Sequence, residues 1–342
     1  MMWTANCLLV TLAIHIPLTA ASSSTQTDYL SPRATQAING IQTWINNNQT
    51  VLSHPYDPVR FPSGMVSLTH NQFTIDPLYH LTYGQGPAAS PPLRRALADF
   101  FNRRFNAQPQ VSPYEIVVGS GVTSLIDSVI WSTCSANESF ILPRPLFNSF
   151  PHDMGLRSSG LVMPASFMWN NQTSSLDDVF NATAIRHSLT QAWSKEALLE
   201  IARFCGERHL HFISDEIYAN SVFTPPHGSK APPFTSVLSL DLAGVIDPNL
   251  VHVLYGMSKD FGASGLRLGA LHSRNENLIQ AATGVNLFAW PSDLVQDMWA
   301  RLLQNQTATD HLLDLNSERL GVSYGVVTSW LVKQNIEYFQ DG

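Results

Sequence analysis

Residues 115–134 read EIVVGSGVTSLIDSVIWSTC, and this stretch indicates the fold class. Its first part, Ile116–Val118, is apolar and β-branched, as in a strand that is buried on both faces. A glycine-rich turn (GSGVTS, 119–124) follows, and a helical pattern begins at about Thr123. A strand that passes through a glycine turn into a helix is the repeating unit of an α/β sheet protein.

The same alternation continues along the chain. Further strands are expected in ESFILPRPLF (138–147), HFISDEIYANSVF (211–223), Val251–Tyr255 and LRLGALHS (266–273), and further helices near Gln36–Asn46, at Leu93–Phe105, after Ser194 as N-cap, at Asp293–Gln304 and at Asp314–Val332. We therefore expect a three-layer α/β/α domain around a mostly parallel sheet. In such a sheet the site lies at the C-terminal edge of the strands.

Composition narrows the function classes. The chain has 342 residues and a formal charge of −7, and only 13% of its residues are charged, against about 25% in an average soluble domain. The basic residues form no tract that could follow a nucleic-acid backbone, so nucleic-acid binding is not expected. The chain has three cysteines, Cys7, Cys134 and Cys205; if the segment with Cys7 is removed as a leader, the other two could form at most a single bridge, and no Cys/His cluster has metal-ligand spacing.

The N-terminal segment, residues 1–24, allows three interpretations. Cys7–Ala20 is mostly apolar, is shorter than a membrane span and ends in small residues, as a secretory signal does. A basic start is missing, however, and His15 and Pro17 interrupt the apolar run. An N-terminal extension and a wrongly chosen start codon stay open beside the signal. The chain also contains N-x-S/T sequons, which permit glycosylation in a secreted protein and also arise by chance; they lie at Asn48, Asn137, Asn171, Asn181 and Asn305.

One expected strand ends in residues suited to chemistry. SDEIYAN (214–220) places Asp215 at the strand end, with Tyr218 three positions later. A buried carboxylate there can keep the ring nitrogen of a heterocycle protonated, and a phenol can donate to a ring oxygen. A helix-capping aspartate beside a half-buried tyrosine would explain the same residues without a ligand.

A second stretch, YGMSKDFGASGLRLG (255–269), contains one lysine, Lys259, and one arginine, Arg267, eight positions apart. The small neighbours of Lys259 predict a partly desolvated amine, as covalent chemistry on a lysine requires. Arg267 can hold a phosphate through two parallel hydrogen bonds, and so can the backbone N–H groups of the GSGVTS turn. A solvated loop lysine and a purely structural glycine turn are the alternatives.

The chain contains, in this order, the glycine turn, an aspartate with a tyrosine, a lysine and an arginine. This order resembles the fold-type I pyridoxal-phosphate enzymes of aminotransferase class I/II. ISDEIYA, YGMSKDFGASGLRLG and YDPVRFPSGMVSL look like the 1-aminocyclopropane-1-carboxylate synthase-like branch, especially its fungal members, and the similarity runs from about Leu30 to Gly342. The resemblance implies pyridoxal 5'-phosphate as cofactor, an α-amino acid as substrate and a homodimer. It implies a cytoplasmic location, unless residues 1–24 are a working signal. It also implies an arm (25–62), a large cofactor-binding domain (63–285) and the start of a small, incomplete α+β domain (286–342).

The resemblance assigns roles to three residues at the reacting centre. Lys259 would hold the cofactor as a Schiff base and move the α-proton of the substrate. Asp215 would pair with the pyridinium nitrogen, and Tyr218 with the ring hydroxyl. The remaining cofactor contacts would come from Arg267, Ser258, Gly121, Val122 and Thr123 at the phosphate, from Phe147 stacked on the ring, and from Tyr83, which would reach the phosphate of the neighbouring subunit.

Four departures from the family pattern bear on activity. An NP-x-NP-x-G turn and the strand before it are absent, as though excised between Thr190 and Ser194. The chain ends before the arginine that binds the substrate's α-carboxylate. His70 replaces a glutamate of the synthases, and Gly256 stands where many members have a serine.

These departures leave the chemistry open. The expected function is transamination, carbon–sulfur lysis or cyclopropane formation on an α-amino acid, of the kind found in fungal secondary metabolism. A catalytically impaired homologue that acts at most as a binding protein is the alternative.

Overall fold

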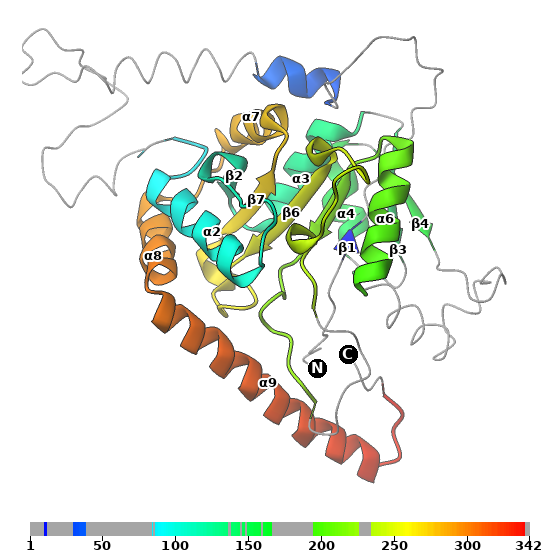
Figure 1. Ribbon diagram of the computed structural model, residues 1–342, viewed down its shortest axis with the longest axis vertical. Coiled ribbons are helices and arrows are strands. Elements are labelled where there is room, and N and C mark those ends of the chain that lie inside the picture. Colours follow the sequence, from blue (N-terminus) through cyan, green and yellow to red (C-terminus); the bar gives the residue numbers. More distant parts are fainter. Residues whose placement is uncertain are drawn as a thin grey trace, which may run out of the picture.

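The computed structural model describes residues 10–11, 30–38, 84, 86–135, 138–143, 146–147, 149–158, 160–165, 194–225 and 234–338. Its centre is a five-stranded sheet in the order β1–β5–β6–β7–β2 (Figure 1). The strands are β1 (Val10–Thr11), β2 (Ile116–Gly119), β5 (Phe212–Asp215), β6 (Val251–Gly256) and β7 (Gly269–Ser273).

The sheet is mixed. β5 pairs in parallel with β6, whereas β7 runs antiparallel to both of its neighbours, so that β2, β5 and β6 share one direction. The return over 257–268 contains no α-helix, whereas a crossover between parallel strands usually does, and β7 runs back antiparallel to β6. The predicted α/β fold is confirmed, and β7 is the expected strand that departs from parallel pairing.

Helices cover both faces of the sheet. The described helices are α2 (Pro91–Arg104), α3 (Val122–Thr133), α4 (Phe150–Ser158), α6 (Lys195–Arg208), α7 (Glu276–Asn286), α8 (Asp293–Gln304) and α9 (Gln306–Lys333), together with a short helix over 32–38. Short 3-10 turns lie at Pro113–Glu115, Val237–Ser239, Pro248–Leu250 and Ser264–Leu266. The expected helices at 93–105 and 293–304 are thereby confirmed, and the one expected at 314–332 is the larger part of α9.

Two separate cores show the three layers. Alternate residues of each strand point to opposite faces, so Val253 and Tyr255 join the core under α2, α6 and α8, while Leu254 joins the core under α3, α4 and α7. Trp299 of α8 is fully buried in the first core. Burying a large apolar side chain contributes about 1.5–3 kcal/mol. α8 therefore packs on the sheet domain, although it lies in the region expected to begin a small domain.

A second sheet lies apart from the first. β3 (Ser139–Pro143) and β4 (Leu161–Ala165) pair in parallel with each other and with no other described strand. The outer edge of β5 instead pairs with β1, antiparallel, through Ser214 and Ile213. The sheet is thus interrupted where the sequence predicts a missing central strand.

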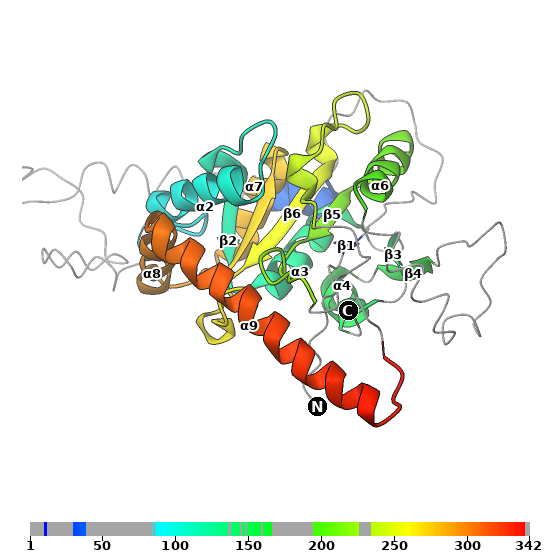
Figure 2. The same cartoon turned by 60° about the horizontal axis from the view of Figure 1, so that its bottom comes forward.

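α9 extends beyond the sheet. It begins beside α8 and runs out past the sheet domain (Figures 1 and 2). Asn305 caps its start, since its side chain accepts a hydrogen bond from the Ala308 N–H. Among the described residues, no helix is both long and apolar enough to span a membrane.

Candidate active site

The end of β6 carries the predicted lysine. Lys259 lies on the return that joins β6 to β7, and its Nζ is 5.4 Å from the centroid of the Tyr218 ring. Tyr218 follows β5, whose last residue Asp215 stands opposite Leu254 of β6. Since β5 and β6 are parallel, the predicted lysine, tyrosine and aspartate meet at the same edge of the sheet. The Lys259 side chain is exposed, so the desolvation predicted from its small neighbours is not observed.

Asp215 is buried at the floor of this cluster. Burial raises the pKa of its carboxyl to about 7, and the neighbouring Glu216 carboxylate adds to that effect. The backbone N–H of Ile217 donates to Oδ1 of Asp215 at 3.2 Å, and this bond and the Lys259 charge partly oppose the rise in pKa. A carboxyl in this environment gains most from a cationic partner, because a nearby positive charge favours its ionised form.

The glycine turn forms the start of α3. Gly121 is the N-cap, with a φ of 90°, and no side chain caps the helix. The N–H groups of the first turn, which begins with Val122 and Thr123, point away from the helix and have no acceptor within it. Together with the helix dipole they favour an anion at this position.

Arg267 completes this anion-binding turn. Its Nη2 donates to the Ser120 carbonyl at 3.4 Å and its Nη1 to the Ser264 carbonyl at 3.0 Å. A Cβ added to Gly121 would lie 2.5 Å from Nη2 of Arg267, so only glycine allows this approach. The structure therefore brings the predicted arginine to the predicted turn.

Gly256, three positions before Lys259, stands where many family members have a serine, and a steric reason accounts for the difference. A Cβ at Gly256 would lie 2.8 Å from the Leu268 carbonyl oxygen and 3.1 Å from Cγ2 of Val122. No side chain fits there in this backbone arrangement. Ser258 is partly buried and directly precedes Lys259 in the chain.

One aromatic candidate, Phe147, stands apart from the cluster. Phe147 follows β3, is half-exposed, and makes an edge-on contact with Phe150, with ring centroids 5.4 Å apart. It is thus carried by the two-stranded sheet rather than by the sheet that bears Lys259. Tyr83 lies outside the described residues, as does His70.

Two buried carboxylates beside the predicted site residues were missed by the sequence analysis. Glu216 accepts hydrogen bonds from Ser214, Ser236 and the Val237 N–H, and so ties the 234–240 segment to β5. Asp260 accepts hydrogen bonds from the turn after β5 and from Tyr255 of β6. Glu216 directly follows Asp215, and Asp260 directly follows Lys259, in a chain that has few charged residues. Their position next to predicted site residues was the signal by which the sequence could have identified them.

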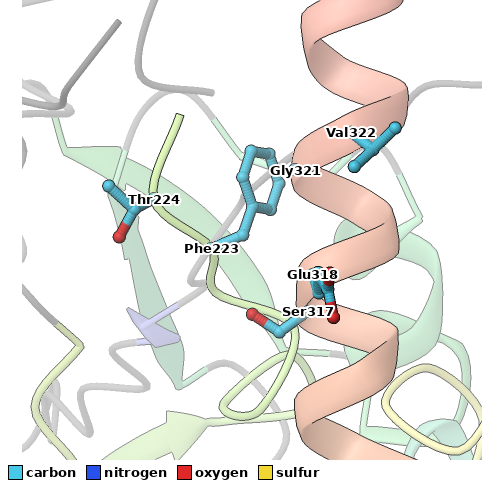
Figure 3. Close-up of a pocket in the computed structure, with 6 residues that line it drawn as sticks. All are labelled: Phe223, Thr224, Ser317, Glu318, Gly321 and Val322. Atoms are coloured by element: carbon cyan, nitrogen blue, oxygen red, sulfur yellow. The ribbon is translucent and has the colours of Figure 1, made fainter. Parts of the chain in front are cut away.

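A pocket of about 350 Å³ lies elsewhere, between α9 and the segment after the Tyr218 turn (Figure 3). Its lining residues are Phe223, Thr224, Ser317, Glu318, Gly321 and Val322. None of them belongs to the lysine cluster. The chemistry-bearing side chains therefore place the candidate site at the sheet edge and not in this pocket.

The comparisons with known proteins agree with this arrangement. Residues 82–340 match the aminotransferase class I and II family, and the chain belongs to that family. "Probable aminotransferase aclI" of Aspergillus oryzae is 28% identical over 277 residues, which cover 76% of this chain and 66% of that protein. The chain thus spans about two thirds of the length of this relative.

Two further relatives carry different descriptions. 1-aminocyclopropane-1-carboxylate synthase 7 of Arabidopsis thaliana is 25% identical over 327 residues, covering 83% of this chain and 72% of that protein. "Probable inactive 1-aminocyclopropane-1-carboxylate synthase-like protein 2" of Mus musculus is 30% identical over 278 residues, covering 74% and 46%. The resemblance found in the sequence is thereby confirmed.

Solved structures confirm the fold. An aminotransferase from Staphylococcus aureus superposes with a TM-score of 0.60 at 15% identity, covering 98% of this chain and 77% of that one. Aspartate aminotransferase from Thermus thermophilus with maleate gives a TM-score of 0.59 at 19% identity, covering 94% and 83%.

Proposed function

We propose that this protein binds pyridoxal phosphate at Lys259 and catalyses transamination, or a related lyase reaction, of an α-amino acid. The meeting of Lys259, Tyr218 and Asp215 at one sheet edge carries the proposal. The residues fit the groups of the cofactor. The Lys259 amine suits its aldehyde, a buried carboxyl suits its ring nitrogen, and an uncapped helix start with Arg267 suits its phosphate.

Each residue then has a definite task. Nζ of Lys259 would take the proton from the substrate's α-carbon and, in transamination, would pass a proton to the former aldehyde carbon of the cofactor. The Asp215 carboxylate keeps the ring nitrogen protonated, and the hydroxyl of Tyr218 donates to the ring oxygen. The bound cofactor supplies a protonated ring that accepts the electron pair left on the α-carbon.

The anion-binding turn would hold the phosphate of the cofactor. Arg267 and the first N–H groups of α3 hold the phosphate, with Ser258 beside them. The proposal includes a homodimer in which Tyr83 reaches the cofactor phosphate of the neighbouring subunit. It also includes stacking of the Phe147 ring on the cofactor ring. Choice among transamination, carbon–sulfur lysis and cyclopropane formation depends on residues that contact the substrate's side chain and carboxylate.

A catalytically impaired homologue is the second candidate, and two observations favour it. Lys259 is exposed, whereas covalent lysine chemistry benefits from a desolvated amine. The ring-stacking candidate Phe147 lies between β3 and α4, away from the sheet that bears Lys259. In this case the chain would act at most as a cofactor-binding or partner-binding protein.

Absorbance and reductive trapping test the proposal. After incubation with pyridoxal phosphate and removal of the unbound cofactor, the purified chain should be yellow, and borohydride should fix the cofactor to the peptide that contains Lys259. Lys259→Ala should be colourless, while Lys195→Ala, which removes a lysine at the start of α6, should match the parent protein. A parent protein without colour or label at saturating cofactor would rule out the proposal.

Activity then separates the two candidates. A labelled protein that converts amino acids to keto acids, or eliminates a β- or γ-substituent, is the proposed enzyme. A labelled protein inactive on a panel of the common amino acids with several keto-acid acceptors is the impaired homologue.

A further inference from the structure

Asp260 directly follows Lys259 but lies in a different environment. Its side chain is buried, with 2% of its surface exposed, while the lysine is exposed. The two side chains of one short turn therefore leave the backbone in different directions. The Asp260 carboxylate faces the interior and the Lys259 amine faces the candidate site.

Every hydrogen bond recorded at the Asp260 carboxylate comes from a donor. Oδ1 accepts from Oγ of Ser221 at 2.6 Å. Oδ2 accepts from the backbone N–H and Nδ2 of Asn220, at 2.9 and 3.1 Å, and from the hydroxyl of Tyr255 at 2.8 Å. Surroundings that supply only donors match an ionised carboxylate, which can only accept. Burial raises the pKa of Asp260, and these hydrogen bonds oppose that rise.

One of these donors is anchored in the core. Tyr255 of β6 is fully buried, and its ring contacts Phe100 at 5.6 Å and Phe105 at 5.1 Å between centroids. The tyrosine cannot follow a moving loop. Its hydroxyl therefore fixes the lysine turn relative to the sheet and α2.

The other donors belong to the turn after β5. Asn220 and Ser221 come just after Tyr218 in the chain. Asp260 therefore joins the turn that carries Lys259 (the lysine turn) to the turn that carries Tyr218 (the tyrosine turn). Nε of Arg104 on α2 donates to Oδ1 of Asn220 at 3.1 Å and orients that amide. α9 adds a contact, because Nδ2 of Asn316 donates to the Asp260 carbonyl at 3.4 Å.

We propose that Asp260 is a positioning residue, whose carboxylate locks the lysine turn to the tyrosine turn and so sets Lys259 Nζ in place over Tyr218. The inference rests on the proposed function, since it assigns the lock a purpose in covalent capture of the cofactor. If Asp260 had only a structural role, it would hold the fold equally well whatever the direction of the Lys259 amine.

The test separates covalent capture from simple binding. The full chain is mixed with pyridoxal phosphate, and the rate of borohydride-trapped labelling at Lys259 is measured by peptide mass. Affinity for pyridoxamine phosphate, which lacks the aldehyde, is measured by fluorescence titration. The turn at Gly121 and Arg267 binds both compounds, whereas only the first compound reacts with the lysine.

Asp260→Asn should label about ten- to a hundredfold more slowly, because small misplacements of a reacting group carry costs of that size. Its affinity for pyridoxamine phosphate should stay within about twofold of the parent protein, because the phosphate turn does not contact Asp260. Asp260→Glu should recover part of the labelling rate. Ser221→Ala, a milder change that removes the donor to Oδ1, should show a smaller loss in the same direction.

Glu115→Gln is the matched control. Glu115 is a structural carboxylate at the opposite end of the sheet, where it accepts from the Ser112 N–H and contacts His272. It should lower stability without slowing the labelling. Labelling by Asp260→Asn and Ser221→Ala at the parent rate would overturn the inference, and so would parallel losses of labelling and pyridoxamine-phosphate affinity. A parent protein that neither labels nor binds would overturn the proposed function and this inference with it.

Discussion

Arg267 reaches from the lysine-bearing return to the glycine turn, where its Nη2 donates to the Ser120 carbonyl at 3.4 Å. The contact joins the return between β6 and β7 to the start of α3. The candidate anion site and the lysine therefore lie at one corner of the sheet.

Gly121→Ala should break this corner. Gly121 has a φ of 90°, and an added Cβ would lie 2.5 Å from Nη2 of Arg267. Backbone strain of this kind costs about 1–3 kcal/mol, and the displaced guanidinium would also leave the phosphate. We expect affinity for pyridoxamine phosphate to fall at least about tenfold, which corresponds to about 1.4 kcal/mol, in a fluorescence titration.

Gly262→Ala is the control for that strain. Gly262 also has a positive φ, of 61°, but an added Cβ would meet nothing within 4 Å. This variant should lose stability and keep its affinity. Equal affinity losses in the two variants would show that strain alone, and not the Arg267 contact, governs binding.

The stability of the cofactor-free protein should fall as the pH rises from about 4 to 7. Burial raises the pKa values of both Asp215 and Glu216 to about 7, whereas unfolded carboxyls titrate near 4. The folded state then binds more protons than the unfolded state in this window, so raising the pH favours unfolding. Each shift corresponds to on the order of 3 kcal/mol.

Urea denaturation between pH 4.5 and 8 measures this dependence. Asp215→Asn and Glu216→Gln should each flatten the curve, because each removes one group that titrates in the window. A free energy of unfolding that rises between pH 5 and 7 in the parent protein would contradict the assignment.

Tyr255→Phe should lower the free energy of unfolding by about 1–3 kcal/mol, since it deprives the buried Asp260 carboxylate of one donor. The remaining donors, Asn220 and Ser221, keep the carboxylate partly satisfied. Chemical denaturation measures the loss. Tyr114→Phe, at an exposed tyrosine, should change stability by less than about 0.5 kcal/mol. Equal stability of the two variants would mean that the Tyr255 hydroxyl contributes nothing.

The two described thiols should be unreactive in the folded protein. Cys134 and Cys205 are free and buried, so the single bridge left open by the sequence is not formed. Burial raises the pKa of Cys134 to about 11 and that of Cys205 to about 12. Because the thiolate is the nucleophile, iodoacetamide should label both only after unfolding. Peptide mass mapping measures this, and rapid labelling of the native chain would refute it.

Local sequence patterns predicted most of the described elements. α6 begins after Ser194 as expected, because that hydroxyl accepts from the Ala197 N–H. α8 has the predicted bounds, since an acidic residue starts it and its apolar residues keep helical spacing. α9 begins earlier than expected, at Gln306, because Asn305 acts as its cap.

The site was predicted as far as it depends on motif order. Lys259, Tyr218 and Asp215 meet as expected because each follows a strand at one sheet edge. The Asp260 lock was not predictable, since its donors on the tyrosine turn lie about forty residues away in the chain. The exposure of Lys259 was also missed, because desolvation depends on distant segments and not on chain neighbours.

The separation of β3 and β4 from the main sheet has a consequence for how the protein opens. Among the described residues, no backbone hydrogen bonds between strands join the two sheets. β3, β4 and α4 are therefore attached to the rest of the protein through side-chain packing on α3. Such a part can detach as a cooperative unit of its own. Amides of β3 should therefore exchange with deuterium through a lower-energy opening than those of β6.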